Sequence, residues 1–195
     1  RKINSDVDMI GYIEIPKLGL SIPLYIGANQ KNLYKGAAVM LQTTMPIGGK
    51  NTNCVIAGHR GGYNGEQLFK NIENLENGDE IYIINPWDTL TYTVLKEIVI
   101  NANDVEAIKI FENQDMITLF TCHPYGSNTH RYVVYAKRKG TEGVVNLPNG
   151  VSFEPSEKKI VTEKLVNYVL LFISIIFLII ITIKRKQELR KQNGY

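Results

Sequence analysis

The sequence predicts a mainly β (all-β) protein, in which about eight strands and a few short helices form a closed barrel or a sandwich, followed by one membrane-spanning helix. Two observations carry this prediction. Over residues 1–140, short apolar or alternating segments rich in Val, Ile, Tyr and Thr are separated by turn residues, as is typical of small all-β domains. Residues 165–183 instead form one uncharged run, "LVNYVLLFISIIFLIIITI". A chain of 195 residues is long enough for one domain with a real core.

Eight segments fit the strand pattern, and turn signals separate them. "NGDE" at 77–80 and "INPWDT" at 84–89 are typical of turns between strands. Helical patterns are few and short, and the two candidates are "GEQLFKNIENL" at 65–75 and "DVEAIKIF" at 104–111. The predicted strands cover residues 11–16, 22–27, 36–40, 52–59, 79–85, 89–100, 116–122 and 131–138.

The C-terminal part predicts a membrane anchor. As a helix, the run 165–183 would measure roughly 28 Å, close to the hydrocarbon thickness of a bilayer. The tail 184–195, "KRKQELRKQNGY", carries a formal +4, so the rest of the chain carries −1 of the net +3. Basic residues directly after a membrane helix favour the cytoplasmic side, which puts the N-terminal domain outside the cell. The net positive charge of the chain therefore indicates its orientation in the membrane and gives no indication of nucleic-acid binding.

These features divide the chain into four predicted parts. Residues 1–140 form the β domain, and the polar segment 141–164, which contains Glu, Lys and Pro, is a linker to the membrane. The membrane helix at 165–183 and a basic cytoplasmic tail at 184–195 follow.

The chain has two cysteines, Cys54 and Cys122. An extracellular domain could pair them, but Cys54 lies in the apolar run "NCVIAG", where a small buried residue fits a strand. Cys122 lies at the end of another predicted strand, in "TLFTCHPYGSNTHRYVV", beside several ionisable groups. A free cysteine in such surroundings is a candidate nucleophile, because the reactive thiolate forms only where its environment favours it.

A catalytic cysteine needs a histidine within reach and a cationic or donor group where an oxyanion forms. Side chains alternate between the two faces of a strand, so His123, which follows Cys122, faces away from it. After a tight loop the chain returns in a strand that Arg131 opens, and either His130 or Arg131 can face the cysteine, but not both. If Arg131 faces the site, His59, at the end of an earlier strand, is the histidine left to serve it.

The residues alone also allow ordinary structural roles, because a strand-end histidine or a strand arginine is usually solvated or packed. A metal site at Cys122, His123 and His130 has no familiar zinc spacing and no evident fourth ligand. Four acidic residues flank a turn without the spacing of an EF-hand, so we predict a solvated charged turn, no required metal and no other cofactor. These residues are Glu73, Glu76, Asp79 and Glu80.

Three elements resemble the signature of the sortase family. "TLFTC" at 118–122 is similar to the TLxTC motif that carries the sortase nucleophile, and "AGHRG" at 57–61 resembles the segment with the family's histidine. Arg131, nine positions after the cysteine, also matches. The resemblance runs from "GYIEIPKLGLSIPLYIG" through "AKRK" in the expected order. It implies a closed, sortase-type β-barrel.

Within the family, "TCHPYGSNTHR" and the membrane helix with its basic tail resemble class C, the sortases that polymerise pilins on Gram-positive cells. The resemblance implies Cys122 as nucleophile, His59 as general acid/base and Arg131 as the residue that holds the substrate and the oxyanion. The implied reaction cleaves the Thr–Gly bond of an LPXTG-like sorting signal through a thioester and transfers the acyl group to a pilin lysine amine. The implied partners are pilin or surface-protein substrates and the membrane, without nucleic acid.

Two features depart from class C. No acidic-aromatic lid motif precedes "DVDMIGYIEIP", and "LPNG" at 147–150 is similar to a sorting signal but lacks its threonine, so we interpret it as a linker turn. Two other functions remain open: a sortase that attaches proteins to peptidoglycan, and a non-catalytic β-barrel adhesion domain on a membrane stalk. The adhesion domain explains the barrel and the helix but gives no joint role to Cys122, His59 and Arg131.

Overall fold

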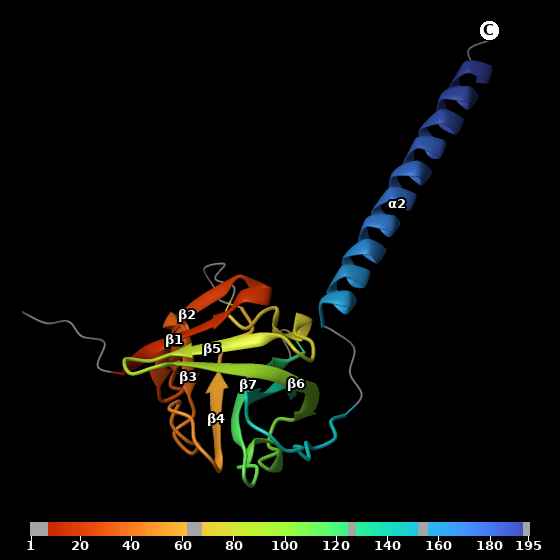
Figure 1. The fold of residues 1–195 in the computed structure, drawn as a ribbon. Helices are drawn as coiled ribbons and strands as arrows, with labels where there is room; N and C mark the ends of the chain where they lie inside the picture. Colours follow the sequence, from red (N-terminus) through yellow and green to blue (C-terminus); the bar gives the residue numbers. More distant parts are fainter. Residues whose placement is uncertain (1–7, 62–67, 125–127, 152–155, 193–195) are drawn as a thin grey trace, which may run out of the picture. The chain divides into compact units, whose positions relative to one another are not determined.

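The chain divides into two compact units, Arg1–Phe153 and Glu154–Tyr195. All eight strands belong to the first unit, and the second contains one long helix (Figure 1). The computed structural model describes residues 8–61, 68–124, 128–151 and 156–192, with the side chains of the long helix described over 168–187.

Eight strands close into one barrel, which confirms the predicted fold class. The strands are β1 (Met9–Ile15), β2 (Leu20–Ile26), β3 (Ala37–Val39), β4 (Thr52–Ala57), β5 (Glu80–Ile84), β6 (Thr89–Asn101), β7 (Asp115–His123) and β8 (His130–Arg138). Their order around the barrel is β1-β2-β3-β4-β7-β8-β6-β5. Each strand overlaps the segment predicted for it, and the ends differ by two residues at most.

Two strand pairs are parallel, and one of them forms the edge of the barrel at which the candidate site lies. β2 pairs with β3 and β4 with β7 in parallel, whereas the other neighbouring strands are antiparallel. Since β4 and β7 run in the same direction, their C-terminal ends lie side by side at one edge. β8 pairs with β7 in antiparallel orientation, on the side of β7 away from β4.

The barrel interior holds the main hydrophobic core. Alternate strand residues point inward: Ile117 and Leu119 of β7 and Tyr132 and Val134 of β8 are fully buried there. A second, smaller cluster packs on the other face of the same strands, where Val133 points outward. Its buried members are Ile98, Ile100, Ala107, Phe111, Met116, Val133 and Tyr135.

Two short helices lie near the N-terminus of the barrel, and the sequence pattern predicts neither. η1 (Pro16–Leu18) is a single 3-10 turn, and α1 (Gln30–Lys35) is a six-residue α-helix. The side chain of Asn29 caps α1 by accepting a hydrogen bond from the amide of Asn32 at 3.0 Å. A helix of six residues is too short to show a 3.6-residue periodicity in the sequence.

Both predicted helices are wrong in the residues that the structure describes. The segment 65–75 begins outside the described residues, and its described part holds only the 3-10 turn η2 (Ile72–Asn74). The segment 104–111 holds only η3 (Glu106–Ile108). In the first case the helical spacing comes from residues that each contact the core without forming a continuous helix. These buried residues are Leu68, Phe69, Ile72 and Leu75.

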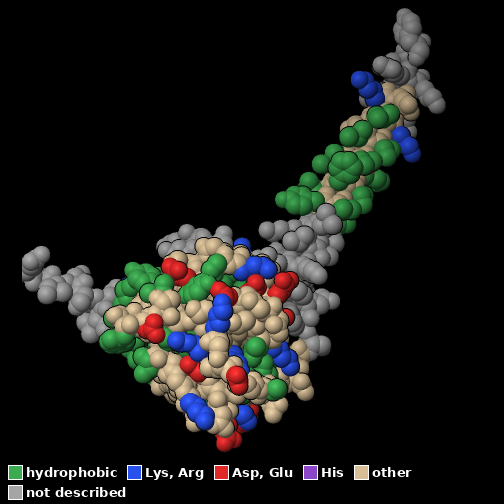
Figure 2. All heavy atoms as spheres, viewed as in Figure 1, with side chains coloured by type: hydrophobic (Ala, Val, Ile, Leu, Met, Phe, Trp, Pro, Cys, Tyr) green, Lys and Arg blue, Asp and Glu red, His purple; other side chains and the backbone are tan. Residues whose placement is uncertain are grey.

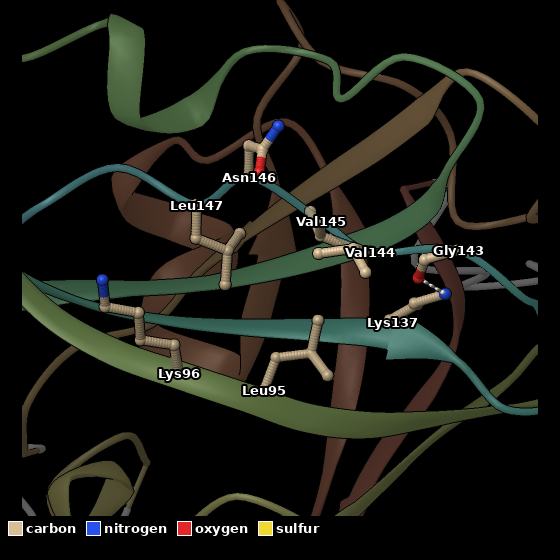
Figure 3. A pocket seen from close by; sticks show the side chains of 8 residues that line it. All are labelled: Leu95, Lys96, Lys137, Gly143, Val144, Val145, Asn146 and Leu147. Carbon is tan, nitrogen blue, oxygen red and sulfur yellow. Dashed lines mark hydrogen bonds between the residues drawn. The ribbon is translucent and has the colours of Figure 1, made fainter.

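The first part of the predicted linker, residues 143–151, lies along β6 and β8, and we call it the strap (Figure 3). Two lysines hold it. Lys137 of β8 donates to the carbonyl of Gly143 at 2.7 Å, and Lys96 of β6 donates to the carbonyl of Pro148 at 3.0 Å. Val145 and Leu147 of the strap pack against the smaller hydrophobic cluster, and a pocket of about 560 Å³ is lined by residues of both the strap and the strands. The "LPNG" stretch is thus part of a segment fixed to the barrel surface.

The second unit is the helix α2 (Ser156–Gln192). Figure 2 shows apolar side chains around it and basic side chains towards its C-terminal end. Among the described residues, it is the one helix long and apolar enough to cross a membrane, over Tyr168–Gln187 with a mean hydropathy of 2.3. It could therefore anchor the protein in a membrane. α2 is longer than the predicted span 165–183, and the boundaries of linker, span and tail stay predictions.

Candidate active site

The β7–β8 pair places Cys122 opposite Arg131. In the antiparallel register, Cys122 pairs with Arg131 and His123 pairs with His130. Cross-strand partners point to the same face of a sheet. The thiol and the guanidinium therefore share one face, and the two histidines share the other. The alternation of side chains predicted that His123 faces away from Cys122 and left Arg131 and His130 as alternatives, between which the register selects Arg131.

The end of β4 brings His59 to the same edge of the barrel. Ala57, the last residue of β4, pairs with Phe120 of β7. The amide of Gly58 then donates to the carbonyl of Phe120 at 3.1 Å, and the hydroxyl of Thr121 donates to the carbonyl of Gly58 at 2.7 Å. These bonds tie the residue before His59 to the strand that carries the cysteine.

A close approach between Gly58 and Phe69 further fixes the backbone that presents His59. A Cβ atom at Gly58 would lie 2.6 Å from the ring of Phe69, which is fully buried. The amide of Phe69 donates to the carbonyl of His59 at 2.9 Å. The glycine therefore lets the aromatic ring pack directly against the backbone that presents His59.

Cys122 and His59 line one pocket of about 230 Å³. Most of its wall is apolar, and residues of α1 and its flanks contribute to it, which the sequence did not indicate. Tyr34 of α1 meets the ring of His59 edge-on, with the ring centroids 5.8 Å apart. The pocket suits an apolar side chain held beside the thiol. Its lining residues are Ala28, Leu33, Met40, Ala57, Gly58, His59, Phe120, Thr121 and Cys122.

Arg131 stands next to this pocket and is held by its own loop. Its guanidinium carbon lies 5.8 Å from the centre of the Phe120 ring, a cation–π contact with a wall of the pocket. One guanidinium nitrogen donates to the carbonyls of Asn128 and His130, both at 2.8 Å. Since a guanidinium carries five N–H donors, these bonds orient the group without exhausting its capacity to bind an oxyanion.

A buried charged network behind the cysteine is the main feature that sequence reasoning missed. Arg60, 5% exposed, forms an ion pair with buried Glu73. Its Nη1 donates to the carbonyl of Cys122 at 3.2 Å and to Nδ1 of His123 at 2.9 Å. The available signal was a charged residue directly after His59 in an otherwise small and apolar segment.

His123 is held neutral by this network. Arginine only donates hydrogen bonds, so Nδ1 of His123 accepts and the ring proton lies on Nε2. Burial lowers the pKa of His123 to about 4, and the positive charge of Arg60 acts in the same direction. Because its side chain lies on the opposite face of β7 from Cys122, His123 is not placed to act on the thiol.

The two cysteines are both free, as predicted. Cys54 is 2% exposed in the barrel core, and burial raises the pKa of its thiol to about 12. It therefore stays a thiol and is chemically inert. Cys122 is partly exposed in the pocket.

Within the described part of the chain, no three or more His, Cys, Asp or Glu side chains are grouped to hold a metal ion. In particular, Cys122 and His123 face opposite sides of β7 and do not converge. The prediction of a solvated charged turn is wrong for Glu73, whose side chain is buried and paired with Arg60, whereas Glu80 pairs with Lys139 at the surface. That the protein requires no metal stays a prediction.

The buried histidine predicts a loss of stability in acid. The pKa of His123 is about 4 in the fold and about 6.5 in an unfolded chain, so the unfolded state takes up the proton first as the pH falls. Its contribution to the free energy of unfolding is complete above pH 6.5 and is lost towards pH 4. The expected loss is on the order of 2–3 kcal/mol, measured by urea unfolding in detergent across this range.

A His123→Gln variant should lack this part of the acid sensitivity. His130→Gln is the matched control, since it changes the cross-strand partner on the same face. Because His130 is the smallest of the three causes that lower the pKa of His123, this variant should keep most of the wild-type pH dependence. An identical pH dependence in the wild type and in His123→Gln would contradict the prediction.

The closed barrel gathers a cysteine, a histidine and an arginine at one edge, which defines a β-barrel protein with a candidate cysteine-based active site. The family model of the Sortase domain matches residues 13–139. The chain belongs to the sortase family, as its motifs indicate.

Curated relatives are sortases as well. Sortase D of Bacillus subtilis (strain 168) is 28% identical over 131 residues, which cover 66% of this chain and 63% of that protein. Sortase A of Bacillus anthracis is 33% identical over 134 residues, which cover 69% of this chain and 61% of that protein. The chain thus spans less than two thirds of the length of these relatives.

Similar solved structures are class C sortases, which confirms the predicted likeness to this class. The pilus-related sortase C of Group B Streptococcus is 36% identical with a TM-score of 0.65, and the match covers 68% of each chain. Sortase C of Streptococcus pneumoniae is 34% identical with a TM-score of 0.66 and 73% coverage of each chain. Sortase C of Clostridium perfringens SM101 is 35% identical with a TM-score of 0.63, covering 69% of this chain and 72% of that one.

Proposed function

We propose that this protein is a pilin-polymerising sortase that cleaves an LPXTG-like sorting signal and joins it to a lysine amine of another pilin. The observation that carries the proposal is the shared pocket: Cys122 and His59 line it together, and Arg131 pairs with Cys122 in register. The likeness to class C structures, one pilus-related and one with pilin substrates, supports the choice of substrate.

In the first half of the reaction, Sγ of Cys122 attacks the carbonyl carbon of the signal's threonine. The guanidinium of Arg131 stabilises the oxyanion that develops on the carbonyl oxygen. The thiol proton passes by way of His59 to the nitrogen of the following glycine, and the Thr–Gly bond breaks. A thioester between Cys122 and the substrate remains.

In the second half, the lysine ε-amine attacks the thioester carbonyl. His59 takes a proton from the attacking nitrogen and returns it to Sγ of Cys122 as the C–S bond breaks. The products are an isopeptide bond and a free thiol. Because a thioester keeps most of the reactivity of the acyl group, the transfer needs no ATP.

The membrane helix determines on which side of the membrane this reaction takes place. With α2 across the membrane, the basic residues that follow its apolar stretch favour the cytoplasmic side, and the barrel then lies outside the cell. Pilin and surface-protein substrates are present there. The described side chains of this basic cluster are Lys184, Arg185 and Lys186.

The test uses the full chain in detergent with an LPXTG-type peptide and two competing amines, a pilin-derived lysine peptide and a peptidoglycan cross-bridge amine. Mass spectrometry follows the adduct on Cys122 and the transferred product. Preferential transfer to the lysine peptide supports the proposal. Preferential transfer to the cross-bridge amine would favour peptidoglycan anchoring, and an inert thiol with no adduct across several signal variants would favour the adhesion domain.

Arg131 gives a prediction specific to the oxyanion. Arg131→Ala is expected to slow thioester formation by on the order of 10²–10³-fold, because a fixed donor at the developing charge is lost. Arg131→Lys should recover only part of the rate, since an ammonium cannot keep both carbonyl bonds and the flat contact with Phe120. Single-turnover acylation measures both.

Arg138→Lys is the matched control, because it makes the same change at the other end of β8. It is expected to leave the acylation rate unchanged. Equal rates for Arg131→Lys and the wild type would argue against a guanidinium-specific role.

A further inference from the structure

A buried ion pair lies directly behind the strand that carries Cys122. Arg60 and Glu73 are in contact, and their side chains are only 5% and 2% exposed. Burying two charges is expensive, and a well-packed apolar pair of the same size is often as stable or more stable. Packing alone therefore does not account for a charged pair at this position.

Arg60 directs its other donor contacts at the nucleophile's strand. Nη1 bonds the carbonyl of Cys122 at 3.2 Å and Nδ1 of His123 at 2.9 Å. The guanidinium carbon also lies 5.8 Å from the centre of the ring of Tyr132 in β8. One side chain thus contacts two consecutive residues of β7 and one of β8, while its own backbone directly follows His59.

These contacts occur where the backbone pairing of β4 and β7 ends. The pairing reaches Ala57 and Phe120, and the amide of Gly58 adds one further bond to Phe120. Beyond that point, the side chain of Arg60 bridges the two strand ends through the carbonyl of Cys122. It therefore connects the backbone that presents the nucleophile with the backbone that presents the histidine.

We propose that Arg60, held and neutralised by Glu73, is a positioning residue of this site, which fixes the backbone of Cys122 relative to His59 and keeps the net charge behind the thiol near zero. The inference rests on the proposed role of Cys122 as nucleophile. Neither Arg60 nor Glu73 is placed to touch the substrate, because both side chains are buried behind β7.

The paired charges make an electrostatic prediction that a purely structural role does not. Removing the charge of Glu73 alone leaves a positive charge behind the thiol, which favours the thiolate, and removing the charge of Arg60 alone leaves a negative charge, which disfavours it. Loosening of the fold would not shift the two variants in opposite directions. The titratable and charged groups around Cys122 in the described residues are Tyr34, His59, Arg60, Glu73, His123, His130 and Arg131.

The experiment measures alkylation of Cys122 by iodoacetamide across pH in the full chain in detergent. Peptide mass spectrometry separates this site from Cys54. Glu73→Gln is expected to move the midpoint of the profile down by roughly 0.5–1 pH unit, and Arg60→Gln to move it up by a similar amount. Both are compared with the wild type after the fold has been checked by circular dichroism.

A double variant, Arg60→Met with Glu73→Met, keeps the proposal testable if either single variant fails to fold, since it leaves no unpaired buried charge. Its midpoint should return close to that of the wild type. Thioester formation with the sorting peptide should nevertheless fall by about tenfold or more, because the carbonyl of Cys122 has lost its donor and the reacting groups are less well aligned.

Glu76→Gln is the matched control, because it removes the same charge three residues further along at a side chain that is 78% exposed. It should leave midpoint and rate unchanged. The proposal is overturned if Glu73→Gln and Arg60→Gln shift the midpoint in the same direction or not at all, or if the double variant acylates at the wild-type rate. A wild type that is alkylated but forms no thioester with any sorting peptide would instead reject the proposed function.

Discussion

Replacement of Cys122 by alanine is expected to abolish the thioester adduct and to lower peptide transfer by on the order of 10⁴-fold or more. The pocket offers one thiol, and covalent catalysis has no substitute for it. Intact-protein mass spectrometry with the sorting peptide measures the adduct, and product analysis with added amine measures transfer.

Cys54→Ala is the control for this experiment. Cys54 lies in the barrel core, where burial raises the pKa of its thiol to about 12, so its removal should leave the adduct in full. Adduct formation that persists in Cys122→Ala, or that maps to Cys54, would contradict the assignment of the nucleophile.

Replacement of His59 by glutamine is expected to slow both acylation and transfer by about 10³-fold, in the range that a positioned general acid/base contributes. Glutamine keeps a polar side chain of similar size beside Tyr34 but cannot carry a proton between the thiol and the two amines. Single-turnover acylation and aminolysis of the isolated thioester measure the two halves separately.

The His130→Gln variant again provides the comparison, because it removes an imidazole on the face of the hairpin that points away from the thiol. Its rates should remain close to those of the wild type. If His59→Gln retained full activity while His130→Gln lost it, the acid/base role would belong to the other face of the hairpin.

The strands could be predicted because their signal is local. Each of them combines apolar alternation or a short apolar run with turn residues at both ends, and all eight were found within two residues of their observed ends. The two predicted helices were wrong because they rested on local spacing alone. The spacing of Leu68, Phe69, Ile72 and Leu75 looks helical, but the contact of each residue with the core produces it.

Within the site, alternation along a strand was sufficient to separate His123 from Cys122 and to leave Arg131 and His130 as alternatives. The observed register decides between them by pairing Arg131 with the cysteine. The family resemblance supplied the assignment of roles. The pair of Arg60 and Glu73 escaped prediction because its burial depends on contacts between segments far apart in the sequence, which no local pattern reports.

The parallel pairing of β4 and β7 also bears on the order of folding. The two strands meet across 63 residues of sequence, as the bond from Thr121 to Gly58 illustrates. Contacts of such long range form slowly, because the chain must first lose the entropy of closing a large loop. His59 therefore comes to lie beside Cys122 only once β4 and β7 have paired. Under the proposed mechanism, acyl transfer would begin only once these two strands have paired.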